Sequence, residues 1–159
     1  MTLKFLGNIN SDLRVAKIKS KDTRELLKRI NAAIEKCVEN VYQFDIIFNK
    51  IGYFSKEQFI VWLGANTNHN LLRLVQNLDD NLAVLGFEKE KRKYNSHITL
   101  GRGRHIGGNR QEELKYTILN HKFQLTEKFS VRGISLIDST LTSSGPIYKT
   151  LNTYKMLKS

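Results

Sequence analysis

Cysteine and proline are scarce in this sequence, which contains one of each. The single cysteine, Cys37, has no partner for an internal disulfide, so we expect a protein of the cytoplasm, where thiols stay reduced. Because Pro146 is the only proline and no low-complexity linker interrupts the chain, we expect a single domain over residues 1–159. No stretch approaches the roughly 20 apolar residues that span a membrane, so we expect no membrane partner.

Acidic residues are also in short supply. Lys and Arg number 26 against 15 Asp and Glu, which gives a formal net charge of +11. Such a surplus attracts polyanions, of which nucleic acid is the first to consider. The alternative is a solvated basic surface with no particular partner. The remaining composition, with 40% hydrophobic and 26% charged residues, is typical of one α+β or α/β domain with its own core.

Apolar residues at helical spacing predict a long helix over residues 22–37 and a shorter one that begins at Asn109. Asp22 and Glu25 have the spacing of a capping box, as do Asn109 and Glu112. The residues expected to face the core from the first helix are Leu26, Ile30, Ala33, Ile34 and Cys37.

A further long helix is predicted to follow a cap at Thr67 or Asn68. Its expected inward residues are Leu71, Leu74, Val75, Leu78, Leu82 and Leu85. Gly86 is placed to end it, because glycine readily adopts the left-handed conformation of a helix C′ position.

Strands are predicted from apolar residues that alternate or run together. Alternate residues from Tyr42 to Phe48 are apolar or aromatic, which is strand spacing. Gln58–Gly64 is nearly all apolar and is therefore expected to be a buried strand. The remaining predictions are a strand at Tyr94–Gly101, a basic, glycine-rich loop at Arg102–Gly108, and two strands at Phe129–Asp138 and Ile147–Met156 around a turn at Ser143–Pro146.

The order of these elements contains a repeat. Met1-Thr2-Leu3 is followed by a helix and two strands, and Ile98-Thr99-Leu100 is followed by the same series. The second series is preceded by a long helix, whereas the first has nothing before it. A duplicated domain would therefore begin here in the middle of its first unit.

The strongest local signal for chemistry is the segment from Ser96 to Arg102. On a strand, His97 and Thr99 share one face, so an imidazole lies beside a hydroxyl on a rigid element. Imidazole suits proton transfer near neutral pH, and a hydroxyl can donate to a phosphate oxygen. Arg102, Arg104 and His105 follow at once and could hold the charge of a phosphodiester. The alternative is a polar strand face that merely meets solvent.

Two other residues are weaker candidates for substrate binding. Lys4 alternates with Thr2 on the same face of an expected strand and could touch phosphate, although a solvated lysine is an equally simple interpretation. Tyr94 lies three residues before His97 and could stack on a base, although simple packing explains it as well.

Cofactor and metal signals are missing. The loop at Gly101–Gly108 carries Ile106 where a dinucleotide fingerprint requires its last glycine, so that interpretation is rejected. The histidines lack zinc-ligand spacing, and His69 and His121 are expected at the surface. Trp62, in an apolar strand, is expected in the core. We therefore expect neither a cofactor nor a metal.

These segments resemble the RNA 2′,3′-cyclic phosphodiesterases, also called 2′-5′ RNA ligases, of the 2H phosphoesterase superfamily. That family carries two His-x-Thr-x motifs, and His97–Arg102 matches the second in full. Thr2–Gly7 matches the first except for its histidine, which would lie one position before Met1. Similar family segments correspond to Phe44–Phe54, Ile60–Gly64, Gly86-Phe87, Ile134–Ser139 and Gly145–Tyr148.

The resemblance implies a duplicated α+β fold, with two pseudo-symmetric lobes whose antiparallel sheets line a central cleft and whose helices lie outside. It also implies that the chain as given lacks the N-terminal strand, helix and first motif histidine of its relatives.

The resemblance implies a metal-independent hydrolysis of a terminal 2′,3′-cyclic phosphate to a 2′-phosphate, with 2′-5′ ligation as a side activity. His97 would be the general base and the absent histidine the general acid. Thr2 and Thr99 would bind the phosphate, assisted by Arg102. The expected partners are RNA ends or nucleotides, the expected oligomeric state is a monomer, and the chain as given is expected to hydrolyse slowly.

Two other functions stay open at this point. The fold and its basic surface could serve a non-catalytic RNA- or nucleotide-binding module, which the absent histidine favours. Alternatively, the substrate could be a small cyclic nucleotide, for which the charge of +11 would bring no advantage.

Overall fold

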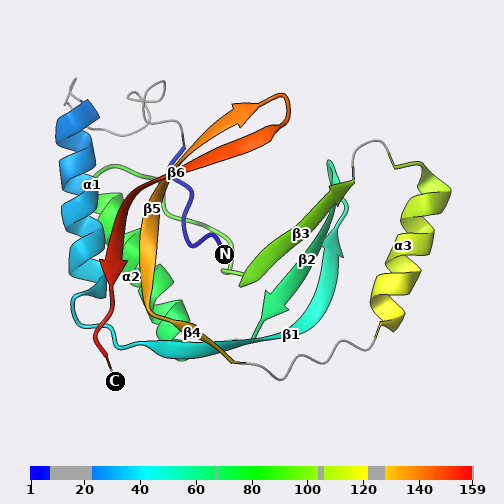
Figure 1. The fold of residues 1–159 in the computed structure, drawn as a ribbon, viewed down its shortest axis with the longest axis horizontal. Coiled ribbons are helices and arrows are strands. Elements are labelled where there is room, and N and C mark those ends of the chain that lie inside the picture. Colours follow the sequence, from blue (N-terminus) through cyan, green and yellow to red (C-terminus); the bar gives the residue numbers. More distant parts are fainter. Residues whose placement is uncertain (8–22, 67, 104–105, 122–127, 159) are drawn as a thin grey trace. The chain divides into compact units, whose positions relative to one another are not determined.

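The computed structural model describes residues 1–7, 23–66, 68–103, 106–121 and 128–158 (Figure 1). Its elements in chain order are α1 (Thr23–Val38), β1 (Phe44–Phe54), β2 (Phe59–Ala65), α2 (His69–Val84), β3 (His97–Gly103), α3 (Gly108–Asn120), β4 (Lys128–Val131), β5 (Gly133–Thr142) and β6 (Gly145–Lys155). The α+β class expected from the sequence is confirmed. Asp22 and Thr67, the two expected cap residues, lie outside the described residues.

The chain forms two compact units. Unit 1 comprises Met1–Leu3, Asp45–Asn68 and Lys93–Ser130, and unit 2 comprises Lys4–Phe44, His69–Arg92 and Val131–Ser159. The candidate residues Thr2, His97 and Thr99 all belong to unit 1. The expectation of a single domain stays a prediction.

Unit 2 is built on the packing of α1 against α2. Leu26 and Ile30 of α1 and Leu71, Leu74 and Leu82 of α2 are its most completely buried side chains. Each side chain of this size contributes roughly 1.5–3 kcal/mol when it leaves water. The helical spacing of apolar residues predicted these two faces, and the prediction is confirmed.

The C-terminus of α2 ends in the way its sequence predicts. Gly86 has a φ of 96°, which is a left-handed conformation. The Gly86 N–H donates to the Ala83 carbonyl at 2.9 Å, and the Phe87 N–H donates to the Leu82 carbonyl at 3.2 Å. This pair of bonds satisfies the last carbonyls of the helix and directs the chain away from its axis.

The two-stranded sheet of unit 2 is the hairpin of β5 and β6, and β6 packs against α1. The Asn152 side-chain amide donates to Asn31 Oδ1 of α1 at 3.0 Å, and the Tyr154 hydroxyl donates to the same oxygen. These bonds fix the hairpin to the helix at one polar point. Among the described residues, no helix is long and apolar enough to cross a bilayer.

Unit 1 is organised around a four-stranded sheet with the order β3-β2-β1-β4. β2 pairs antiparallel with β1 on one side and with β3 on the other. Phe44, Ile46 and Phe48 are buried, which confirms the alternation predicted for β1. Tyr42 does not continue it: its side chain is 59% exposed, and its backbone makes an isolated bridge to Leu157.

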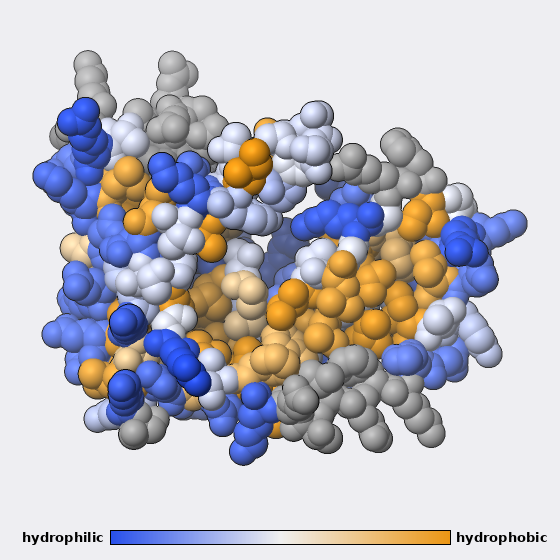
Figure 2. Space-filling model, in the orientation of Figure 1, coloured by the Kyte–Doolittle hydropathy of each residue, from blue (hydrophilic) through white to orange (hydrophobic). Residues whose placement is uncertain are grey.

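One face of this sheet is apolar. By their pairing, Phe59, Val61 and Leu63 of β2 share that face with Ile98 of β3. Ile106 covers the end of it, since a Cβ on Gly103 would lie 2.0 Å from Ile106 Cδ1. Figure 2 shows apolar residues gathered over this sheet and toward α3. The strand predicted to be fully buried is, however, only half-buried from Ile60 to Leu63, because its other face carries the residues described below.

Several predicted element boundaries are wrong. β3 begins at His97, not Tyr94, and the segment predicted as one strand at Phe129–Asp138 is divided between β4 and β5. A Cβ at Gly133, where β5 begins, would lie 2.4 Å from the Tyr154 carbonyl oxygen, so the backbones meet too closely there for a larger residue.

Two turn and cap predictions are also wrong. α3 is capped by Gly107 without a side-chain bond, so Asn109 lies inside the helix and forms no capping box. Pro146 belongs to β6, and the positive φ of the hairpin turn falls on Gly145 at 133°.

Candidate active site

The register between β2 and β3 contains a bulge. Trp62 lies opposite Thr99, whereas its neighbour Val61 lies opposite Gly101. β3 therefore carries one extra residue, Leu100, whose side chain is 57% exposed. A bulge of this kind bends a strand and re-aims the side chains beyond it.

The bulge decides which residues meet. In an unbroken strand, Arg102 would point to the face opposite that of Thr99. With Leu100 bulged, the pairing puts Arg102 opposite Ile60, Thr99 opposite Trp62 and His97 opposite Gly64. Ile60, Trp62 and Gly64 lie on one face of β2, because alternate residues of a strand point the same way. Their partners His97, Thr99 and Arg102 therefore share that face. We call it the His97 face; it is the reverse of the apolar face.

The imidazole of His97 is oriented by the backbone. Its Nδ1 lies 2.8 Å from the carbonyl oxygen of Asn95, which can only accept a hydrogen bond. The proton of the neutral ring is therefore held on Nδ1, and Nε2 keeps a free lone pair. His97 is half-buried. A half-buried imidazole with an unprotonated Nε2 is suited to take a proton from a water molecule.

Aromatic side chains surround this imidazole. The ring of Phe54 meets it edge-on at a centroid distance of 5.4 Å, and the indole of Trp62 lies at 6.3 Å. Phe54 and Trp62 are themselves 5.4 Å apart. These two rings limit the orientations open to His97. The expectation that Trp62 is simply a core residue is wrong, because it is half-buried on the His97 face.

Two glycines make room for the indole. A Cβ on Gly52 would lie 2.3 Å from Trp62 Cζ2, and one on Gly64 would lie 2.8 Å from Trp62 Cζ3. Both contacts are closer than atoms can approach, so the indole occupies the space that side chains at these positions would fill. Its Nε1 is buried and has no hydrogen-bond partner within the described part of the chain.

Sequence reasoning missed Lys50, which belongs to the same face. It pairs with Gly64 across β1 and β2, and its ammonium lies 5.7 Å from the centroid of the Trp62 ring. No carboxylate among the described residues forms an ion pair with Lys50 or Arg102. The His97 face therefore combines an imidazole and a hydroxyl with two cations that lack acidic partners, which suits an anion.

Thr2 and Tyr94 are joined by a hydrogen bond. The Tyr94 hydroxyl donates to the Thr2 carbonyl oxygen at 3.1 Å, which ties the start of the chain to the residues before β3. Burial raises the pKa of Tyr94 to about 12, so the hydroxyl stays protonated as a donor. Residues 1–7 form neither helix nor strand, so the strand expected at Thr2 is wrong. The side chain of Thr2 is exposed, and its contact with phosphate stays a prediction.

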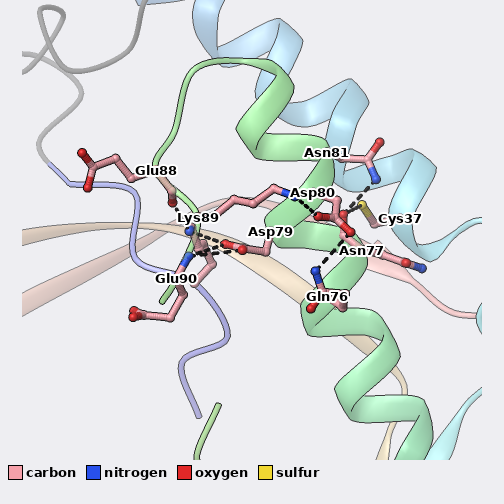
Figure 3. A network of polar contacts seen from close by, with 10 residues as sticks. Cys37, Gln76, Asn77, Asp79, Asp80, Asn81, Glu88, Lys89 and Glu90 are labelled. Carbon is pink, nitrogen blue, oxygen red and sulfur yellow. Dashed lines mark hydrogen bonds and ion pairs between the residues drawn. The ribbon is translucent and has the colours of Figure 1, made fainter. Parts of the chain in front are cut away.

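Lys4 has a partner of its own in unit 2. Its Nζ lies 2.5 Å from Asp79 Oδ1 and donates to the Glu88 carbonyl. Asp79, a buried residue of α2, also accepts from the Glu90 N–H at 3.2 Å, as the network in Figure 3 shows. Because residues 1–7 form no strand, the alternation that placed Lys4 beside Thr2 does not exist. Its role in phosphate binding stays a prediction.

The remaining polar candidates are Arg104, His105, His69 and His121. Arg104 and His105 lie outside the described residues, so their predicted contacts with phosphate stay predictions. His69 is exposed at the start of α2, and His121 is exposed at the end of α3. In the described segments, no three His, Cys, Asp or Glu side chains gather as metal ligands. Cys37 is buried, and desolvation raises the pKa of its thiol.

The fold is shared with solved structures of other proteins. A protein of Thermus thermophilus superposes with a TM-score of 0.66 over 86% of this chain and 73% of that one, at 19% identity. E. coli LigT in its apo form gives a TM-score of 0.64 over 83% of this chain and 68% of its own, at 18% identity. These likenesses show that the chain shares the fold of these two proteins.

Sequence comparison identifies the family. Residues 61–148 match the family described as LigT like phosphoesterase. The RNA 2′,3′-cyclic phosphodiesterase of Methanocaldococcus jannaschii is 31% identical over 95% of this chain and 76% of its own length. That of Archaeoglobus fulgidus is 28% identical over 98% of this chain and 78% of its length. The chain belongs to the LigT-like phosphoesterases, a family of hydrolases, as the motif at His97–Arg102 predicted.

Proposed function

We propose that this protein is an RNA 2′,3′-cyclic phosphodiesterase that opens a terminal cyclic phosphate and leaves a 2′-phosphate. The names of the similar archaeal proteins support this substrate. A structure of E. coli LigT complexed with 3′-AMP supports a site for a nucleotide phosphate. The observation that carries the proposal is the bulge at Leu100, which puts Arg102 on the face of His97 and Thr99.

The proposed reaction is an acid–base hydrolysis. Nε2 of His97 takes a proton from water, and the resulting hydroxide oxygen bonds to phosphorus. The bond from phosphorus to O3′ breaks, O3′ receives a proton, and the phosphate stays on O2′. The Thr99 hydroxyl donates to a non-bridging oxygen, and the Arg102 guanidinium balances the charge that grows on the phosphate. Because these groups supply both proton transfer and charge, we propose that the reaction needs no metal.

The proton for O3′ requires a general acid. By the family resemblance, this is a histidine two positions before Thr2, which is one position before Met1. Losing an acid or base typically slows a reaction about 10²–10⁴-fold. We therefore propose that a polypeptide with this histidine hydrolyses the cyclic phosphate faster than one without it, while both bind RNA ends. We propose 2′-5′ ligation, the reverse type of reaction, as a side activity.

The test compares two versions of the protein on an oligoribonucleotide that ends in a 2′,3′-cyclic phosphate. One is the given chain, and the other carries an added histidine two positions before Thr2; a matched extension carries glutamine instead. We expect the histidine version alone to be faster by about 10²-fold or more, with a 2′-phosphate as the product by ³¹P NMR. Equal rapid turnover by all three would refute the mechanism, and a 3′-phosphate product would refute the proposed bond cleavage.

The alternative is a non-catalytic module that binds RNA or nucleotides. The observation in its favour is that His97 is the only described histidine placed on the His97 face. His97→Ala in the histidine-extended protein separates the two functions. An enzyme loses hydrolysis while it keeps most of its affinity for RNA, whereas a binding module shows no hydrolysis in either form.

A further inference from the structure

Lys50 reaches the His97 face because β1 also carries a bulge. Phe48 pairs with Ala65, but Lys50 pairs with Gly64, so Asn49 is the extra residue. In a regular strand without this bulge, Lys50 would lie on the same face as Phe48, which is buried. The two bulged strands that flank β2 therefore each turn a cation, Lys50 or Arg102, onto the face of His97.

The stem of Lys50 crosses the middle strand. A Cβ on Gly64 would lie 2.9 Å from Lys50 Cγ and 2.8 Å from Lys50 Cε, so the aliphatic chain lies directly over this glycine. Gly64 pairs with His97 on its other side. The side chain of Lys50 thus extends from β1 across β2, toward the strand that carries the imidazole.

No carboxylate of the described ranges pairs with the ammonium of Lys50. Trp62 attracts it as a cation over an aromatic ring, at 5.7 Å from the ring centroid. The indole is itself fixed between Gly52 and Gly64. A cation that is positioned but not neutralised is available to an anionic ligand.

The position of Lys50 indicates which anion it binds. Thr99 and Arg102 lie on β3 with His97, so the hydroxyl and the guanidinium that bind the reacting phosphate are both on that strand. The backbone of Lys50 lies two strands away, roughly 10 Å at the usual strand spacing, and its side chain covers part of that distance, as far as Gly64 of β2. A mononucleotide cyclic phosphate carries one phosphate, whereas an RNA end carries a second one on its 5′ side.

We infer that Lys50 is a second anion-binding position that takes the phosphodiester on the 5′ side of the cyclic end, so that the site selects oligonucleotide ends over mononucleotides. The inference rests on the proposed phosphodiesterase function, because the cyclic phosphate defines the first position. Lys50 is thereby a specificity-determining residue.

The experiment compares Lys50→Gln with the parent, both in the histidine-extended protein. The substrates are a short oligoribonucleotide with a 2′,3′-cyclic end and a nucleoside 2′,3′-cyclic phosphate. We expect Lys50→Gln to raise KM for the oligonucleotide about tenfold, the effect of one charge-assisted hydrogen bond, with kcat unchanged. For the mononucleotide, neither constant should change. The slope of log(kcat/KM) against log[salt] for the oligonucleotide should fall by about 0.7, as for one lost phosphate contact.

Two variants serve as controls. Lys28→Gln removes the same charge from an exposed position on α1 in unit 2, and should leave both substrates unaffected. Lys50→Arg keeps the charge and should retain most of the preference. An equal decrease in kcat/KM for both substrates in Lys50→Gln would place Lys50 at the reacting phosphate and overturn the inference. A loss no larger than that of Lys28→Gln would also overturn it.

A binding measurement keeps this test separate from the test of catalysis. Fluorescence anisotropy is measured with a labelled oligoribonucleotide that ends in a 2′-phosphate, and a nucleoside 2′-monophosphate serves as competitor. If no cyclic phosphate is hydrolysed, the proposed function fails. Lys50→Gln should nevertheless weaken the binding of the oligonucleotide about tenfold and leave the affinity for the competitor unchanged. Equal affinity of Lys50→Gln and the parent for the oligonucleotide would refute the inference independently of any turnover.

Discussion

Replacing Gly52 by alanine tests whether the position of the Trp62 indole sets the geometry of the site. The added Cβ would lie 2.3 Å from Trp62 Cζ2, 2.5 Å from Cη2 and 2.8 Å from Cε2. Carbon atoms of this kind pack at about 3.5–4.0 Å, so the indole has to move by roughly 1 Å or more. Because the indole contacts the His97 imidazole and lies under the Lys50 ammonium, its displacement releases both side chains from their positions.

The size of the effect follows from this displacement. Overpacking of this kind costs typically about 1–3 kcal/mol of stability, which urea denaturation measures. A misplacement of about 1 Å at a reacting group can lower the rate about 10²-fold. We therefore expect Gly52→Ala in the histidine-extended protein to lower kcat by roughly 10–10²-fold, with a smaller change in KM.

Trp62 reports its own displacement, because it is the only tryptophan in the chain. We expect Gly52→Ala to shift its fluorescence emission, and Gly108→Ala to leave emission and rate unchanged. Gly108 is a matched control because a Cβ there meets nothing within 4 Å. In a Trp62→Ala background, Gly52→Ala should cost little further stability, which a double-mutant cycle measures. An unshifted emission spectrum with full activity in Gly52→Ala would refute the reasoning.

Three further predictions concern the remaining contacts. Because burial raises the pKa of Tyr94 from 10.0 to about 12, the stability it contributes is present below pH 10 and lost toward pH 12; unfolding of Tyr94→Phe should depend less on pH over that range. Asp79→Ala removes the carboxylate that pairs with Lys4 and accepts from the Glu90 N–H, and should cost about 1–3 kcal/mol in urea denaturation, whereas Asp80→Ala at the half-buried neighbouring position should change stability less. Chelation with EDTA should leave hydrolysis of the cyclic phosphate unchanged; a loss that added metal restores would contradict the proposed mechanism.

The helices and the family were predictable because their signals are local. Leu26 and Ile30 recur at a spacing that only a helix places on one face, and Gly86 marks the end of α2 by its conformational freedom. Likewise, the motif at His97–Arg102 is continuous in sequence. None of these inferences depends on which strand pairs with which.

The arrangement of the site was less predictable because it depends on register. Alternation along β3 correctly places Thr99 beside His97 but puts Arg102 on the wrong face, since the bulge at Leu100 arises from pairing with β2. Gly101, a glycine within a strand, was the one available signal of a bulge. Lys50 gave no signal, because its place depends on a second bulge. The sequence predicts Trp62 to be a core residue, because an apolar strand does not reveal that Gly52 leaves space beside the indole.

The account depends most directly on His97, Thr99 and Arg102 sharing one anion-binding face. An NMR titration of the histidine-extended protein with an oligoribonucleotide that ends in a 2′-phosphate tests this without turnover. We expect the largest shifts at the His97 imidazole, the Arg102 side chain and the single indole N–H of Trp62. Shifts confined to residues of the opposite face, such as Phe59 and Leu63, with these three signals unmoved, would contradict the account.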